Sequence, residues 1–159
     1  MKRTSLMVVM IASSLVLANT AALAQVKWMA GGKMGLSLLD GNAGFQIAPM
    51  GEVLFGKGPA VGSELGINTQ GGTPVEWANY FKYYFTVPGS KIKPYANGGF
   101  GLWFYTGGPY FSLNFGGGAN FPVAKNLYVP AELQFGPVFG NGGSIFYFAI
   151  TSGIRYEIL

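Results

Sequence analysis

The sequence predicts an all-β fold, an eight-stranded antiparallel up-and-down transmembrane β-barrel with short loops, from three observations. Half of the residues are hydrophobic and only 10% are charged, against roughly 25% charged residues in ordinary soluble domains. After the first residues no run of about 18 apolar residues occurs, so no spanning helix is predicted. Apolar residues instead alternate with small or polar ones, and turn signals divide the chain into eight segments. A closed barrel is the other structure that satisfies its backbone inside a bilayer.

The first 24 residues read as a secretory signal peptide. Lys2 and Arg3 give a positive start, Leu6 to Leu17 form an apolar stretch, and Ala22-Leu23-Ala24 is a small-residue cleavage site. An uncleaved membrane anchor is the alternative, although the apolar stretch is short for a span. We therefore expect export and cleavage after Ala24, which leaves residues 25–159 as one barrel domain.

Eight strands follow in order, each ending where Gly, Pro, Asn or Asp residues supply the backbone angles of a turn. Segments of about ten residues suit strands that cross a bilayer at a tilt, and an even number returns both chain ends to one side. The predicted strands are 25–39, 45–55, 60–68, 75–87, 92–105, 110–123, 127–139 and 144–159.

Five of these strands show the alternation of a β-strand with unlike surroundings on its two sides. Their apolar faces carry Trp28, Met34, Leu36 and Leu38 in the first strand, Trp77, Phe81, Tyr83 and Phe85 in the fourth, Phe111, Leu113, Phe115 and Phe121 in the sixth, Leu127, Val129, Leu133 and Phe135 in the seventh, and Phe146, Phe148, Ile150 and Ile154 in the eighth.

The charged residues decide which face meets water. A soluble barrel would bury the apolar faces, yet the interior of eight strands is only just wide enough to be filled by side chains. We therefore predict that the apolar faces point outward into lipid and that a lumen charge network lines a narrow polar core. That network is Lys33, Glu52, Glu64, Glu76, Lys82, Lys93, Glu132, Arg155 and Glu157; the other charges, Lys27, Asp40, Lys57, Lys91 and Lys125, fall at strand ends or turns.

Aromatic residues gather towards the two ends of the strands, as expected for the girdles that flank the apolar band of a membrane barrel. The alternative is that aromatics are simply common in strands. The predicted girdle residues are Trp28, Tyr95, Phe121, Tyr128 and Tyr156 at the end where the chain enters, and Trp77, Trp103, Tyr105 and Phe146 at the other.

Three segments carry a resemblance to a known family: KIKPYANGGFGLWF, LNFGGGANFPVAKNLYVPAELQFG and the terminal TSGIRYEIL. They resemble the fifth strand, the sixth and seventh strands with their tight turn, and the last strand of the small eight-stranded outer-membrane β-barrels of Gram-negative bacteria. That family includes the transmembrane domain of outer membrane protein A, outer membrane protein X and the opacity-type proteins.

The resemblance implies residence in the bacterial outer membrane, contact with its lipid, and assembly by periplasmic chaperones and the barrel-assembly machinery. It also implies an assembly signal at the end of the chain. Ile158 stands where the family usually has an aromatic residue, and Leu159 follows it. The signal residues are Thr151, Gly153, Tyr156 and Ile158.

The composition also bears on chemistry. With no cysteine and no histidine, the chain offers no disulfide, no thiol nucleophile and no Ser–His–acid arrangement. We predict that it is not an enzyme and that it holds no cofactor or metal. Eight basic residues against six acidic ones follow the signal peptide, too small an excess for nucleic-acid binding.

The lumen charges have two interpretations: an ion path, or paired groups that neutralise one another in a confined core. Inward tyrosines would fill further space, with glycines making room, and the loops are too short and too weakly charged for binding. We expect a structural or envelope-integrity protein with a salt-bridged, plugged lumen. The alternatives are a narrow channel for ions or small solutes and a soluble lipocalin-like periplasmic carrier. The inward tyrosines are Tyr80, Tyr84, Tyr95 and Tyr147.

Overall fold

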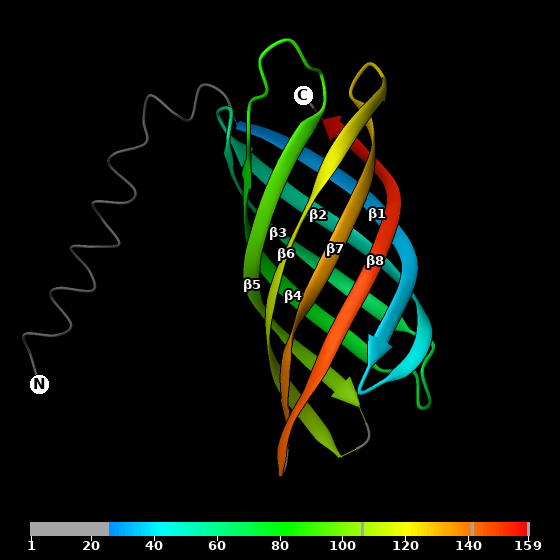
Figure 1. Cartoon of the computed structure of the whole chain (residues 1–159). Helices are drawn as coiled ribbons and strands as arrows, with labels where there is room; N and C mark the ends of the chain where they lie inside the picture. Colours follow the sequence, from blue (N-terminus) through cyan, green and yellow to red (C-terminus); the bar gives the residue numbers. More distant parts are fainter. Residues whose placement is uncertain (1–25, 106, 141, 159) are drawn as a thin grey trace, which may run out of the picture.

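The computed structural model describes residues 26–105, 107–140 and 142–158, which form one closed antiparallel barrel (Figure 1). The predicted signal peptide lies outside the described residues. Each strand pairs with the next, and β1 closes the barrel against β8, with Trp28 opposite Ile158 and Leu39 opposite Tyr147. The predicted eight-stranded up-and-down fold is confirmed. The strands are β1 Val26–Leu39, β2 Asn42–Phe55, β3 Pro59–Asn68, β4 Val75–Tyr84, β5 Lys93–Tyr105, β6 Gly108–Ala124, β7 Leu127–Gly140 and β8 Gly143–Ile158.

The connection between β1 and β2 is shorter than the sequence predicts. Asp40 and Gly41 both have positive φ, at 51° and 76°. Two successive positive angles are the mark of a type I′ hairpin turn, for which Asp-Gly is a favoured pair. The turn therefore needs only these two residues, and β2 begins at Asn42 rather than at residue 45.

The predicted extension of the fourth strand to Val87 is wrong. The last pair of β4 and β5 is Tyr84 opposite Tyr95, after which the Phe85 N–H donates to the carbonyl of Pro94 at 2.8 Å. Pro88 has no N–H to donate and Gly89 turns the chain with a φ of 75°. Residues 85–92 therefore form an eight-residue connection at the barrel end that carries the termini.

Side chains alternate between the barrel wall and its interior along every strand. The outward faces expose large apolar side chains, for example Leu36 at 69% and Phe115 at 46%, whereas the intervening residues are buried. The apolar-out prediction is confirmed. A soluble carrier would not present so continuous an apolar surface to water, so the lipocalin-like alternative is wrong.

Glycines allow close packing at the seam where the barrel closes. A Cβ on Gly153 of β8 would collide with the carbonyl oxygen of Gly32 in β1 and with the backbone of Lys33. Inside the barrel, the hydroxyl of Tyr95 packs over Gly118 on the neighbouring strand, within 2.9 Å of the place a Cβ would take. Both positions need glycine because another chain segment occupies the space of a side chain.

The interior has three layers along the barrel axis. Apolar clusters cap both ends, one at the end opposite the termini and one at the terminal end, and a polar layer lies between them. The first cluster consists of Leu39, Trp103, Val138, Tyr147 and Ala149, and the second of Leu54, Ala60, Tyr84 and Tyr95.

Candidate functional site

The middle of the barrel holds seven charged side chains, each at most 4% exposed. They come from six strands and meet in the lumen because each occupies an inward position of its strand. We call this group the lumen cluster. Its members are Lys33, Glu52, Glu64, Glu76, Lys82, Glu132 and Arg155.

Glu132 on β7 is the centre of the lumen cluster. Its carboxylate lies 2.6 Å from Lys33 Nζ and 2.6 Å from an Arg155 guanidinium nitrogen, while Lys82 Nζ is 3.9 Å away. The hydroxyl of Tyr95 donates a further hydrogen bond to it at 2.6 Å. One carboxylate thus holds together cations from three different strands, β1, β4 and β8.

Glu52 on β2 forms a second centre, joined to the first through Lys82. Lys82 Nζ lies 2.8 Å from its carboxylate, and the hydroxyls of Tyr84 and Tyr80 donate to it at 2.5 and 3.3 Å. The same ammonium lies 4.6 Å from the ring centroid of Tyr80 and 4.5 Å from that of Tyr95. The ammonium group of Lys82 is buried away from water. Its ion pair with Glu52 and its cation–π contacts offset the cost of that desolvation.

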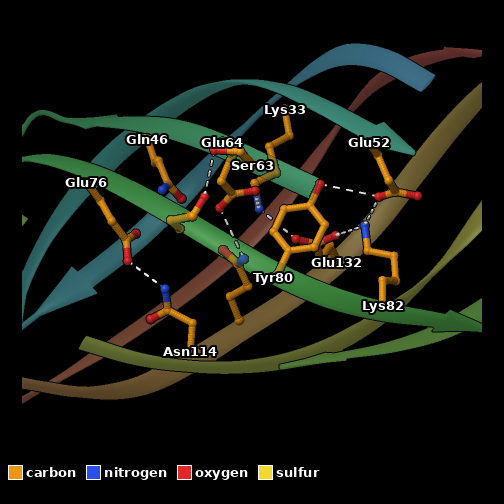
Figure 2. A network of polar contacts seen from close by, with 12 residues as sticks. Lys33, Gln46, Glu52, Ser63, Glu64, Glu76, Tyr80, Lys82, Asn114 and Glu132 are labelled. Carbon is orange, nitrogen blue, oxygen red and sulfur yellow. Dashed lines mark hydrogen bonds and ion pairs between the residues drawn. The ribbon is translucent and has the colours of Figure 1, made fainter. Parts of the chain in front are cut away.

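Glu64 and Glu76 lie on the other side of the lumen cluster, as Figure 2 shows. Glu64 lies 2.8 Å from Lys33 Nζ and accepts a hydrogen bond from Gln134 at 3.1 Å. Glu76 accepts from Asn114 at 2.7 Å and from Ser112 at 3.2 Å. Among the described residues no basic group lies within 4.0 Å of Glu76, so amide and hydroxyl donors, not a cation, hold its carboxylate.

The lumen cluster separates two cavities that open at opposite ends. A cavity of about 520 Å³ lies at the terminal end, and one of about 420 Å³ lies at the other end, beside Trp103. No member of the lumen cluster lines either cavity. The charged layer therefore fills the barrel between them with side chains that bind one another.

Two residues of the predicted network, Lys93 and Glu157, lie apart from the lumen cluster at the terminal rim. Glu157 lies 2.6 Å from Lys27 Nζ and 3.6 Å from Lys93 Nζ, and Tyr128 donates to it at 3.4 Å. Within the described chain no ion pair joins this group to the lumen cluster. Of the charges assigned to turns, Asp40, Lys57, Lys91 and Lys125 are exposed.

Two predicted girdle residues face inward, which corrects that assignment. Tyr95 is 3% exposed and Trp103 only 1%, and Trp103 packs edge-to-face on Tyr147. Both share the face of β5 that carries Gly99 and Gly101, so the period of two places them in the lumen although they lie near strand ends. Tyr95 therefore matches its alternative prediction as a lumen-filling tyrosine.

The remaining girdle residues lie as follows. Tyr105 and Tyr128 also occupy inward positions of their strands, at the two mouths of the barrel. Tyr105 lines the cavity beside Trp103, and Tyr128 lines the terminal cavity and is hydrogen-bonded to Lys93. The other five are exposed on the outer wall. Their contact with a membrane interface stays a prediction. The outward residues are Trp28, Phe121 and Tyr156 at the terminal end and Trp77 and Phe146 at the other.

Sequence reasoning named the charges but missed the neutral polar residues that complete the lumen. The signal was present for Asn114, Asn120 and Gln134, because each sits at an inward position of a strand whose alternation is clear in the sequence; Gln46 lies on the second strand, where the alternation is weaker. Gln134 holds Glu64, Asn114 holds Glu76, and Asn120 accepts a hydrogen bond from Arg155 at 2.9 Å. Gln46, beside Tyr147, accepts one from its hydroxyl at 2.8 Å.

The predicted assembly signal runs along the last strand, β8. Thr151 is inward and buried, whereas Tyr156 and Ile158 are exposed on the outer wall, and Gly153 sits at the seam with β1.

Among the described residues there is no cluster of three acidic, histidine or cysteine side chains that could hold a metal ion. No helix in this part of the chain is long and apolar enough to cross a membrane.

Solved structures match this closed barrel over most of its length. Neisserial surface protein A matches with a TM-score of 0.59 at 13% identity, covering 84% of this chain and 97% of that one. A de novo designed transmembrane β-barrel matches with a TM-score of 0.58 at 17% identity, covering 83% and 95%. The outer membrane protein Ail of Yersinia pestis, determined in a phospholipid bilayer nanodisc, matches with 0.51 at 14% identity, covering 84% and 100%. The fold is that of the eight-stranded outer-membrane β-barrels.

No protein-family model and no curated protein sequence matches the chain. At these low identities the structural matches establish the barrel fold and nothing finer. A designed barrel stands among them, so the outer-membrane barrel fold by itself specifies no role. The role has to be argued from the lumen, the loops and the rims of this chain.

Proposed function

We propose that this chain is an integral outer-membrane protein whose barrel is a structural, envelope-integrity element with a plugged lumen. The observation that carries this proposal is the lumen cluster, in which Glu132 binds Lys33 and Arg155 at 2.6 Å with every partner buried. An ion crossing the barrel would have to separate such pairs. Buried pairs of this kind resist separation, because a buried charge left without its partner is uncompensated and costs about 3–5 kcal/mol of stability.

The loops support a structural role over a binding role. At the end opposite the termini the connections are short, and Asp40 is the one charged residue of the described part of them. Binding functions of a rigid scaffold usually sit on loops that project from it. The barrel offers little of that kind, so its extensive outer contact with lipid is its main interaction.

Export, maturation and assembly belong to the same proposal. The amino-terminal pattern supports removal of residues 1–24, and the terminal strand supports insertion by the barrel-assembly machinery with periplasmic chaperones. The mass of the purified protein tests the first point, since cleavage after Ala24 gives a chain that begins at Gln25. Separation of inner and outer membranes tests the location.

Planar-bilayer conductance of the refolded protein tests the plug. We expect no discrete conductance steps from wild type, with folding checked by its heat-dependent electrophoretic mobility and a conducting porin measured in the same membrane. The double variant Glu132→Gln with Arg155→Gln removes two opposite charges from the lumen cluster, and Glu157→Gln at the rim is the control. Discrete steps from folded wild type would overturn the plug and establish the narrow-channel alternative. Steps from the double variant alone would identify the cluster as the seal.

A further inference from the structure

The two ends of the barrel differ sharply in charge. Apart from the lumen cluster, every basic residue of the described chain lies at the end that carries the termini, in the connections after β2, β4 and β6 or at the start of β1 and β5. At the opposite end the described residues outside the lumen cluster include a single charge, Asp40. The basic residues are Lys27, Lys57, Lys91, Lys93 and Lys125.

Four of these lysines line the cavity of about 520 Å³ at the terminal end, and we call them the basic mouth: Lys27, Lys57, Lys91 and Lys93. The carboxylate of Glu157 lies within 4.0 Å of Lys27 and Lys93. Lys57 and Lys91 have no carboxylate within that distance among the described residues. One acidic group thus faces four cations, and the cavity carries an excess of positive charge.

The same cavity has an apolar wall. Leu54, Phe85, Val87 and Ile92 line it together with the lysines. Much of this wall is the connection from β4 to β5, whose shape is held by hydrogen bonds from Ser90 N–H to the Val87 carbonyl and from Ile92 N–H to the Ser90 hydroxyl, both at 3.1 Å. The cavity of the basic mouth is therefore amphipathic: its lysines form a positively charged part of the lining, and the apolar wall forms the other part.

We propose that the basic mouth binds the phosphate headgroup of an anionic phospholipid from the leaflet at the terminal end, with the glycerol and first acyl carbons against the apolar wall. Lysine ammonium groups bind phosphate as point charges, and anionic lipids are attracted to basic clusters beside a membrane surface. The apolar wall favours an amphiphile over a bare anion. The proposal rests on the barrel spanning a bilayer, but its test requires only folded protein.

Calorimetric titration of the protein, refolded in a non-ionic detergent, measures the binding. The ligand is dihexanoyl-phosphatidylglycerol, and dihexanoyl-phosphatidylcholine and glycerol-3-phosphate are titrated beside it. The variants are Lys57→Gln and Lys91→Gln, which remove cavity lysines in exposed turns. Lys125→Gln is the matched control, because Lys125 is an exposed turn lysine at the same end that does not line the cavity.

We expect phosphatidylglycerol to bind more tightly than the other two ligands. A basic residue near an anionic surface contributes about 1 kcal/mol, so each cavity variant should weaken binding about fivefold and Lys125→Gln less than twofold. Equal binding of the two lipids would overturn the proposal, as would an equal effect of Lys125→Gln. Glycerol-3-phosphate binding as tightly as the lipid would show a site for a free anion and overturn the lipid assignment. Conductance by the wild-type barrel would refute the plugged lumen but would leave the lipid-binding result unchanged.

Discussion

Replacing Glu132 by Gln keeps the shape of the side chain and removes its charge from the centre of the barrel. Glu132 binds Lys33 and Arg155, each at 2.6 Å, and Lys82 lies 3.9 Å away. All four side chains are at most 2% exposed. In the variant Lys33 keeps Glu64 and Lys82 keeps Glu52, but Arg155 loses the one carboxylate within 4.0 Å of it among the described residues. A buried cation is thus left without a carboxylate, in a layer that solvent does not reach.

The geometry sets the size of the effect. Breaking a buried ion pair by removing one partner costs about 3–5 kcal/mol, because the remaining charge is left uncompensated. At the rim, Lys27 is 41% exposed where it meets Glu157, and exposed ion pairs contribute about 0–1 kcal/mol. Glu132→Gln should thus lower the free energy of unfolding by about 3–5 kcal/mol, and Glu157→Gln by less than about 1 kcal/mol.

Urea unfolding of the barrel in lipid vesicles, followed by tryptophan fluorescence, measures both variants under reversible conditions. The double variant Glu132→Gln with Arg155→Met adds a mutant cycle. Removing Arg155, the cation that Glu132→Gln leaves without a carboxylate, should relieve part of the loss of stability. The double variant should therefore be less destabilised than the sum of the single variants. An equal cost for Glu132→Gln and Glu157→Gln would mean that water reaches Glu132, and the reasoning for a sealed lumen would fail.

Three further perturbations test the outer wall and the seam. Gly153→Ala places a methyl group against the β1 backbone and should destabilise the folded barrel by about 1–3 kcal/mol in the same unfolding assay, whereas Gly51→Ala, which meets nothing within 4 Å, should not. Leu133→Arg sets a charge on the lipid-facing wall and should cost about 2–4 kcal/mol; unchanged refolding into vesicles would contradict an outward Leu133. Brominated lipid should quench the two outward tryptophans but spare Trp103, which is 1% exposed, and quenching of all three would put Trp103 back on the outer wall.

The local sequence pattern predicted the direction of each side chain best in strands where apolar and polar residues alternate regularly. Neighbours such as Lys33 and Met34, or Glu132 and Leu133, must point to opposite sides of a strand, and the structure buries the charged residue and exposes the apolar one in each pair. Turn chemistry located the strand ends for a similar reason, since Asp40-Gly41 adopts the positive φ angles of a hairpin turn. The girdle prediction was wrong for Trp103, because it relied on the clustering of aromatic residues near strand ends. The alternation along the same strand places Trp103 on the inward face.

The sequence by itself determined that eight strands alternate, that their apolar faces turn outward and that charged groups line the interior. These follow from the two-residue period of a strand and from the scarcity of charge. Only the tertiary structure decided which charges meet. Lys33 and Glu132 are 99 positions apart, and the lysines of the basic mouth come from different turns and strand ends. A local pattern fixes the direction of each side chain, but its height along the axis and its partner across the lumen depend on the stagger of strands summed around the closed barrel.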